Sequence, residues 1–240
     1  MATFILVHGA WHGAWCWHRI VARLQSQGHV VLAPDLHGLG RDFTPLGEVT
    51  LAGWTGQITQ LIDDSPGPVI LVGHSRGGLI ISEAAEKRPD RIHSLVYLTA
   101  FLLRSGEQLH GSVAATDPNS LVGPHMIVAS DHLSASVADA SVKEAFYGEC
   151  SAEDVVLAKS LLRPEPLAPL VTPLHLTDER FGSVPRIFIE CLRDRAITLP
   201  SQRAMQEALP CKQTFHLDTD HSPFFSRPDE LANVLENIAH

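Results

Sequence analysis

Six short runs of apolar residues recur along the 240-residue chain, each bounded by polar or turn-forming positions. Continuous apolar runs of this length, unlike alternating ones, are typical of strands that are buried on both faces of a parallel sheet. The predicted strands cover residues 3–7, 29–34, 68–73, 93–101, 185–192 and 213–217. The pattern therefore predicts a mainly parallel six-stranded sheet.

Between most of these runs, apolar residues recur at helical spacing. One helix is predicted between Trp17 and Gly28, and a second after Thr50, whose hydroxyl suits an N-cap. A third begins at Pro228, because proline suits the first turn of a helix, and runs toward the C-terminus. Strands that alternate with helices predict a doubly wound α/β fold, in which helices cover both faces of the sheet.

Residues 104–184 break this rhythm. Proline, glycine and serine punctuate the start of the segment, and helical patterns follow within residues 141–162. We interpret residues 104–184 as a helical cap insertion over one edge of the sheet. The chain is short enough for one core, so residues 1–240 are expected to form a single domain that contains this cap.

Charge and composition exclude several classes of protein. The formal net charge of −9 argues against nucleic acid as a partner, because binding to phosphates needs a basic face. No apolar run approaches the roughly 18 residues of a membrane span, and Met1 leads into the first strand without a basic leader. The four cysteines lie far apart without a Cys-x-x-Cys pair, which favours reduced thiols and a cytoplasmic location.

The sequence GHSRGG at residues 73–78 lies where the third predicted strand gives way to a helical pattern. Gly73-x-Ser75-x-Gly77 matches the nucleophile elbow, a strained strand-to-helix turn whose flanking glycines let neighbouring backbone segments approach. The following helix directs its N-terminal dipole toward Ser75, which favours developing negative charge there. We therefore predict that Ser75 is a nucleophile.

A serine nucleophile needs a histidine base, and the base needs an orienting carboxylate; after this motif they follow in the order acid, then histidine. His221 is the predicted base, because it follows the last strand on a loop; His216 lies within that strand, and His240 ends the chain. Asp194 is the predicted acid, because it follows the carboxyl end of the preceding strand. The weaker alternatives are Asp218 and Asp220, which would have to bend back locally.

Acyl transfer also needs two donors that face the oxyanion. The backbone N–H groups of Arg76, in the elbow, and Ala10, in the loop after the first strand, are predicted to form this oxyanion hole. The Arg76 side chain could pair with a carboxylate or extend into the cap, and the sequence leaves this open.

His8, His12 and His18 lie close together in the chain, which raises a metal site as an alternative. Their glycine-containing loop lacks the His-Glu-x-x-His pattern of a ligand-bearing helix, so no metal is expected.

These motifs resemble the α/β-hydrolase superfamily, and within it the small plant methylesterases and hydroxynitrile lyases with their bacterial esterase relatives. The resemblance covers nearly the whole chain. The first strand, the elbow and the histidine loop are shared across the superfamily, whereas the cap segment points to this group more narrowly. The similar segments are residues 4–17, 31–40, 71–78, 147–170 and 218–231.

The resemblance also separates two activities. Hydroxynitrile lyases of this group carry a threonine after the oxyanion-loop histidine and a lysine after the catalytic histidine. This chain has Gly9 and Ser222 at those places, so both lyase-specific groups are missing. Ester hydrolysis is therefore the leading hypothesis, and a lyase, an acyltransferase and a non-catalytic ligand-binding homologue remain as alternatives.

The resulting expectation is a carboxylesterase that hydrolyses small carboxylic esters through an acyl-enzyme, without a cofactor. Its expected partner is a small-molecule ester, and the quaternary state is left open, a homodimer included. Specificity is expected to lie in the cap and the oxyanion loop. The candidate substrate-binding residues are Gly9, Trp11, Phe101, Leu102, Met126, Phe146, Ser222 and Phe224.

Overall fold

A six-stranded sheet forms the centre of the computed structural model, which describes residues 1–112 and 115–240. Residues 113 and 114 of the predicted cap segment lie outside the described residues. The strand order is β2-β1-β3-β4-β8-β9, and all five neighbouring pairs are parallel. All six predicted strands are confirmed: β1 Thr3–Val7, β2 Val30–Leu32, β3 Val69–His74, β4 Ile92–Leu98, β8 Arg186–Cys191 and β9 Gln213–Leu217.

The order of the strands creates a switch point between β1 and β3. From β1 the chain moves outward to the edge strand β2, and then returns to the other side of β1 to form β3, β4, β8 and β9. Ligands of open parallel sheets bind beyond the carboxyl ends of the strands at such a point. Here those ends lead into the loop that begins at His8 and into the turn at Ser75.

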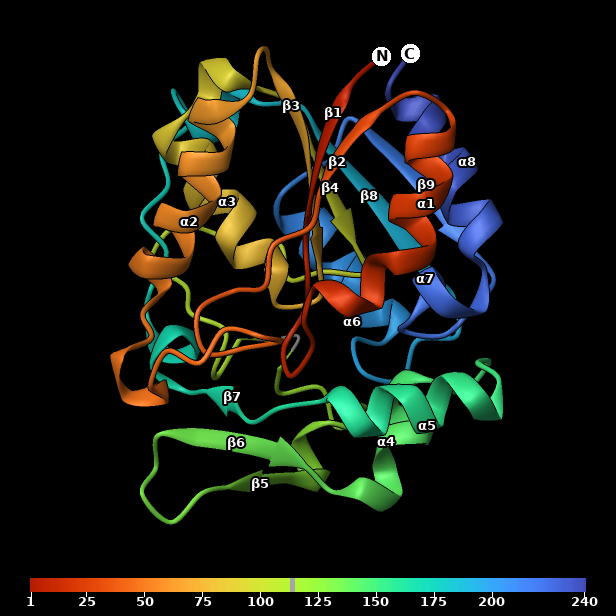
Figure 1. The fold of residues 1–240 in the computed structure, drawn as a ribbon. Coiled ribbons are helices and arrows are strands. Elements are labelled where there is room, and N and C mark those ends of the chain that lie inside the picture. Colours follow the sequence, from red (N-terminus) through yellow and green to blue (C-terminus); the bar gives the residue numbers. More distant parts are fainter. Residues whose placement is uncertain (113–114) are drawn as a thin grey trace.

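Alternate residues of β1 explain why helices cover both faces of the sheet. Ile5 and Val7 belong to one apolar core, together with buried residues of α2 and α3. Phe4 and Leu6 point to the opposite face, into a second core with α1 and α8. Figure 1 shows these two helix layers on either side of the sheet. The sheet-covering helices are α1 His18–Ser26, α2 Leu51–Asp64, α3 Gly77–Lys87, α6 Leu199–Ala208, α7 Pro223–Ser226 and α8 Pro228–Ile238.

The predicted helix starts agree with the structure. The hydroxyl of Thr50 accepts a hydrogen bond from the Gly53 N–H at 3.0 Å, so Thr50 is the N-cap of α2. Pro228 occupies the first position of α8. A short 3₁₀ turn, Ala14–Trp17, precedes α1.

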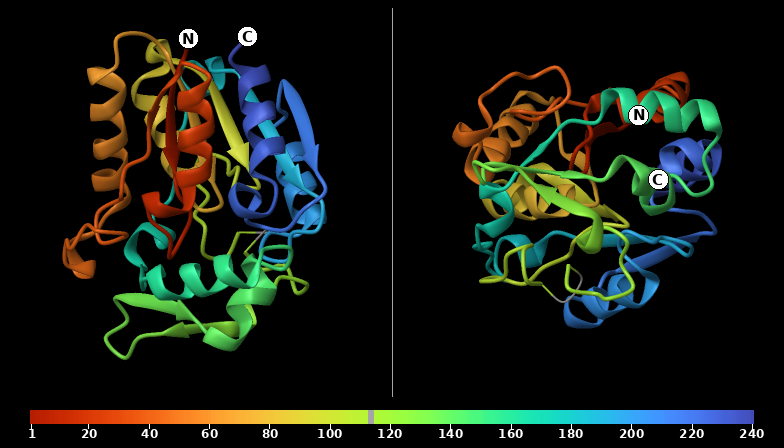
Figure 2. Two further views of the ribbon diagram at one scale, coloured as in Figure 1. Left: turned by 45° about the vertical axis from the view of Figure 1, so that its right-hand side comes forward. Right: turned by 90° about the horizontal axis from the view of Figure 1, so that it is seen from below.

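The segment between β4 and β8 lies across the carboxyl ends of the strands (Figures 1 and 2). It contains two helices, α4 Asp139–Phe146 and α5 Ala152–Leu161. It also contains a small antiparallel sheet in the order β5-β6-β7 (β5 Met126–Val128, β6 Ser134–Val137, β7 Glu165–Pro166). The apolar pattern did not predict these strands, because they are two to four residues long and β5 is mostly exposed.

Within the described residues, the structure has no helix with both the length and the apolar character needed to cross a membrane.

Candidate active site

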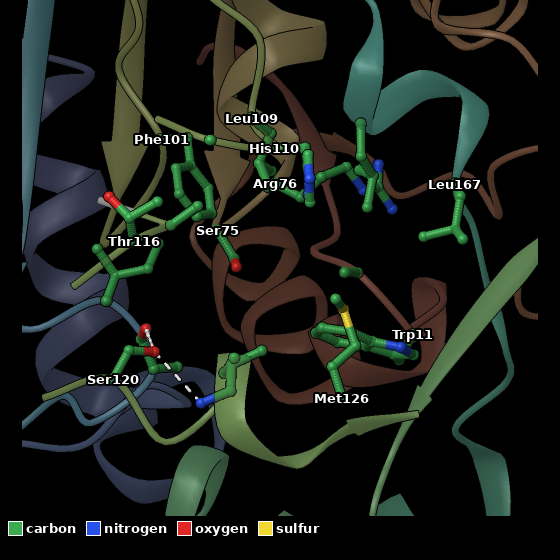
Figure 3. A pocket seen from close by; sticks show the side chains of 18 of the residues that line it. Trp11, Ser75, Arg76, Phe101, Leu109, His110, Thr116, Ser120, Met126 and Leu167 are labelled. Carbon is green, nitrogen blue, oxygen red and sulfur yellow. Dashed lines mark hydrogen bonds between the residues drawn. The ribbon is translucent and has the colours of Figure 1, made fainter. Parts of the chain in front are cut away.

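Ser75 occupies a strained turn between β3 and α3. Its φ is +53°, a left-handed conformation that is uncommon for residues other than glycine. The Ser75 carbonyl accepts hydrogen bonds from the N–H groups of Gly78, at 3.1 Å, and Phe101, at 3.0 Å. These bonds hold the turn, and the Ser75 side chain points into the cavity beyond the sheet (Figure 3).

Close backbone packing explains two of the glycines around Ser75. A Cβ atom on Gly77 would lie 2.8 Å from the carbonyl oxygen of Val7 in the neighbouring strand β1. A Cβ atom on Gly73 would lie 2.8 Å from the carbonyl oxygen of Gly77. Both distances are shorter than any ordinary carbon–oxygen contact, so the turn can pack against β1 only if these positions are glycine.

Asp194 and His221, which follow the neighbouring strands β8 and β9, meet in a buried hydrogen bond. His221 Nδ1 lies 2.6 Å from Asp194 Oδ2. Because the carboxylate accepts, Nδ1 carries the proton, and the neutral ring therefore presents an unprotonated Nε2. Asp194 Oδ1 accepts the N–H groups of Ala196 at 2.6 Å and Ile197 at 3.0 Å, and the Thr99 hydroxyl donates to Oδ2. This network orients the imidazole.

The histidines and carboxylates that were weighed against this pair have other partners. His216 Nδ1 lies 2.9 Å from Glu190 Oε2, and His240 Nε2 lies 3.0 Å from Glu236 Oε1. Asp218 is largely exposed and forms an ion pair with Arg193 at 3.0 Å. Asp220 accepts the Glu149 N–H at 2.8 Å and the Ser226 hydroxyl at 2.9 Å, so it ties the histidine loop to the cap segment.

His74, the residue before Ser75, packs against His221. Their ring centroids are 4.5 Å apart, and His74 Nε2 donates to the His221 carbonyl at 2.8 Å. Burial, reinforced by His221, lowers the pKa of His74 well below its usual value. His74 therefore remains neutral, and it links the Ser75 turn to the backbone of the histidine loop.

Hydrogen bonds fix both peptide groups around Ala10. The Gly9 carbonyl accepts from His8 Nδ1 at 2.9 Å and from Arg76 Nη2 at 3.0 Å. The Ala10 carbonyl accepts from His12 Nδ1 at 2.7 Å. Within the described residues, the N–H groups of Ala10 and Arg76 donate no backbone hydrogen bond. Both N–H groups are therefore free to bind a ligand beside Ser75.

The side chain of Arg76 is fully buried and pairs with Glu165 of β7, at 2.8 Å between Nε and Oε1. Its guanidinium also lies over the Trp54 ring, 4.1 Å from the centroid. Burial lowers the pKa of Arg76 and raises that of Glu165, and each shift is opposed by the charge of the partner. The sequence left pairing with a carboxylate and entry into the cap as alternatives for this side chain, and the structure shows both.

A cavity of about 310 Å³ opens in front of Ser75. Its wall is mainly apolar, and Arg76, already paired with Glu165, is the one Lys, Arg, Asp or Glu side chain among the described residues that line it. Figure 3 shows the Ser75 hydroxyl directed into this space. The other principal lining residues are Trp11, Phe101, Leu109, His110, Val122, Met126, Phe146, Leu167, Leu170 and Ile197.

Four of the residues predicted from the sequence to bind substrate therefore line the cavity: Trp11, Phe101, Met126 and Phe146. Four others lie outside its wall. Phe224 lies in the core that contains Phe4 and Leu6, where its ring contacts Trp17 and His74. Ser222 is buried within the histidine loop. Gly9 packs against His74 and Ser75. Leu102 is buried in the core that contains Ile5 and Val7.

Sequence reasoning did not find Glu165 or Thr99. Glu165 lies in the segment that carries the family resemblance, but its contact with Arg76 depends on how the cap folds over the sheet. Thr99 follows β4, which ends without a carboxylate, and so it drew no attention as a partner for Asp194. A search for hydroxyls at the strand ends beside the predicted acid could have found it.

Comparisons with known proteins identify relatives of this chain. The chain is 34% identical over 247 residues to the putative chloroplastic methylesterase 11 of Arabidopsis thaliana, and the match covers 98% of this chain and 63% of that protein. The chain thus spans less than two thirds of that relative. It is also 34% identical over 253 residues to methylesterase 1 of Arabidopsis thaliana, with 98% and 95% of the two chains covered.

Among solved structures, a pyrethroid hydrolase from Sphingobium faniae JZ-2 superimposes with a TM-score of 0.89 at 28% identity, over 99% of this chain and 97% of that one. The family model described as the alpha/beta hydrolase family matches residues 4–234. With the parallel sheet, the serine at the strained turn and these matches taken together, the chain belongs to the alpha/beta hydrolase family.

Proposed function

We propose that this protein is a carboxylesterase that hydrolyses small, uncharged carboxylic esters. Ser75 attacks the ester carbonyl while His221 Nε2 accepts its proton, and Asp194 orients the imidazole. The alkoxide leaves with that proton, and water then hydrolyses the acyl-enzyme by the same route. The observation that carries the proposal is the strained Ser75 at the floor of an apolar cavity, next to the His74–His221–Asp194 chain of contacts.

The oxyanion in this proposal is bound by the N–H groups of Ala10 and Arg76. Two features support this assignment. Ala10 and Arg76 both line the cavity beside Ser75, and their N–H groups have no backbone acceptor within the described residues. In addition, Arg76 is the residue that precedes α3, so its amide belongs to the free N-terminal end of that helix.

The site lacks the lysine and the threonine that the hydroxynitrile lyases of this group carry. Ser222, at the place where a lyase of this group carries its lysine, is neutral and fully buried. At the place of the threonine, a Cβ atom on Gly9 would lie only 2.9 Å from the Ser75 Cβ. The methylesterase names of the sequence relatives point in the same direction as these two positions.

The test compares wild-type protein with Ser75→Ala and with Ser94→Ala, a second buried serine that lies on β4 outside the cavity. Turnover of p-nitrophenyl butyrate is followed together with acid release in a pH-stat, and mandelonitrile cleavage is measured in parallel. We expect Ser75→Ala to lose a factor on the order of 10³ or more in kcat/KM, while Ser94→Ala keeps wild-type activity. Ester turnover that survives in Ser75→Ala, or cyanide release by the wild type, would contradict the proposal.

A further inference from the structure

The Arg76 side chain and Glu165 together hold the loop that contains Ala10. Arg76 Nη2 donates to the Gly9 carbonyl at 3.0 Å, while Glu165 Oε2 accepts the Trp11 N–H at 2.9 Å. The ion pair between Arg76 and Glu165 connects these two contacts. One buried pair thus reaches both peptide groups that flank Ala10.

The geometry of a trans peptide turns these contacts into a constraint on the Ala10 N–H. All described peptide bonds are trans, and in a trans peptide the C=O and the N–H of one plane point in opposite directions. The Gly9 carbonyl and the Ala10 N–H share such a plane. Because Arg76 Nη2, together with His8 Nδ1, holds the carbonyl on one side, the N–H is directed to the other side, and Ala10 lines the cavity beside Ser75.

The loop would not keep this shape by itself. Trp11 has a φ of +63°, which is unfavourable for a large L side chain, so the native turn needs contacts that compensate for the strain. The Glu165 carboxylate supplies one of them at the Trp11 N–H. Glu165 belongs to β7, so the cap segment takes part in shaping the oxyanion loop.

We propose that the Arg76–Glu165 ion pair is a positioning device for the oxyanion hole: Arg76 contributes its amide to the oxyanion, and its side chain, held by Glu165, fixes the direction of the Ala10 amide. This inference rests on the proposed esterase function. It assigns specific roles to a side chain and a cap residue that do not touch the reacting carbonyl. Both residues act on the rate through the Ala10 N–H.

The test uses an alkyl trifluoromethyl ketone beside the ester. When Ser75 Oγ adds to the ketone carbon, its proton passes to His221 and the carbonyl oxygen becomes an oxyanion in the hole. The ketone Ki, taken as the dissociation constant of this adduct, is measured by ¹⁹F NMR titration and needs no turnover. We expect Arg76→Met to raise the ketone Ki and to lower kcat, each by a factor on the order of 10². The KM for p-nitrophenyl butyrate should change less than about threefold.

A second variant distinguishes an effect on catalysis from a loss of folding. Arg76→Met leaves Glu165 buried without its partner, whereas the double variant Arg76→Met/Glu165→Met removes both charges and is expected to fold. Folding is checked by circular dichroism and thermal unfolding. We expect the double variant to show the same loss in kcat and in ketone affinity, because it also lacks the contacts to Gly9 and Trp11.

Arg19→Met is the matched control. Arg19 forms an ion pair with the buried Asp154 of α5 at 2.6 Å, so it also joins the sheet side to the cap. Among the described residues, its side chain forms no hydrogen bond or ion pair with the oxyanion loop. This variant should keep the wild-type kcat and ketone Ki.

The possible results separate the two proposals. Folded Arg76→Met, or the folded double variant, with wild-type kcat and Ki would overturn the positioning role and leave the esterase proposal intact. Wild-type protein that forms no ketone adduct would overturn both. Ketone affinity that falls in the Arg76 variants, in a protein that turns over no ester, would support the positioning role and contradict the esterase proposal.

Discussion

The hydroxyl of Thr99 donates to the same Asp194 oxygen that lies 2.6 Å from His221 Nδ1. Thr99 follows β4, which lies between the strands that lead to Ser75 and to Asp194, and its backbone has a φ of +36°. The strained turn directs the hydroxyl at the carboxylate. Together with the two amide donors on Oδ1, it satisfies a carboxylate that is almost completely shielded from water.

Removal of this hydroxyl should weaken the orientation of His221. We expect Thr99→Val, which keeps the branched shape, to lower kcat by roughly 10- to 100-fold, because a hydrogen bond to a charged group is worth roughly 1.5–3 kcal/mol. Thr99→Ser keeps the hydroxyl and should recover most of the rate. The measurement is steady-state hydrolysis of p-nitrophenyl butyrate, and equal kcat values for the Val and Ser variants would show that the hydroxyl is unimportant.

The absence of a side chain at position 9 should matter for catalysis. A Cβ atom on Gly9 would lie 2.8 Å from His74 Nδ1 and 2.9 Å from the Ser75 Cβ, so Gly9→Ala forces the nucleophile or its neighbour to move. We expect kcat/KM to fall at least 10-fold and the free energy of unfolding to fall by about 1–3 kcal/mol, as for an overpacked core.

Gly56→Ala is the control for this substitution. Gly56 lies within α2 with open space around its missing side chain. Alanine there should raise the free energy of unfolding by about 0.5–1 kcal/mol and leave activity unchanged. Urea denaturation and esterase assays of both variants provide the check, and a fully active Gly9→Ala enzyme would refute the steric argument.

Stability should depend on pH through His12. Burial lowers the pKa of His12 to about 4, and its neutral ring donates from Nδ1 to the Ala10 carbonyl and accepts the Tyr147 hydroxyl at Nε2. The unfolded chain therefore binds a proton at His12 between pH 6.5 and about 4, and the folded protein does not. Over this window stability falls as the pH falls, by about 3 kcal/mol from this residue.

His12→Gln removes the titrating group. Between pH 6.5 and 4, the slope of unfolding free energy against pH should become shallower by the equivalent of about one proton. His18→Gln, the same substitution at an exposed histidine, is the matched control variant. The free energies are measured by urea unfolding at a series of pH values, and an unchanged slope in His12→Gln would contradict the assignment.

The cavity should discriminate against charged esters. Its wall is mainly apolar, and the charge of Arg76 is already compensated by Glu165. An anionic acyl group would lose its hydration without gaining an unpaired lysine or arginine among the described lining residues, which costs several kcal/mol. We expect kcat/KM for a butyrate ester to exceed that for the matching succinate half-ester by a factor on the order of 10². Comparable values for the two esters would require a cation in the pocket.

Local sequence patterns predicted the sheet, four of its covering helices (α1, α2, α3 and α8) and the candidate residues. Continuous apolar runs predicted six strands; helices bury the central strands β1, β3, β4 and β8, whereas the edge strands β2 and β9 are partly exposed. The spacing of Gly73, Ser75 and Gly77 predicted the elbow, because backbone crowding there depends on neighbours in the chain and on one adjacent strand. Asp194 and His221 were chosen because each follows a strand, and in parallel neighbouring strands such positions meet.

Only the tertiary structure decided what surrounds those residues. Trp11 and Glu165 are 154 positions apart, and no periodicity relates them; they meet because the cap segment folds across the strand ends. Phe224 is apolar, as a pocket-wall residue would be, but the orientation of α7 directs its ring into the core. The strands β5, β6 and β7 are too short for an apolar pattern and form through pairing with one another. Long-range packing, which local hydrophobic periodicity does not encode, therefore set the shape of the pocket and the partner of Arg76.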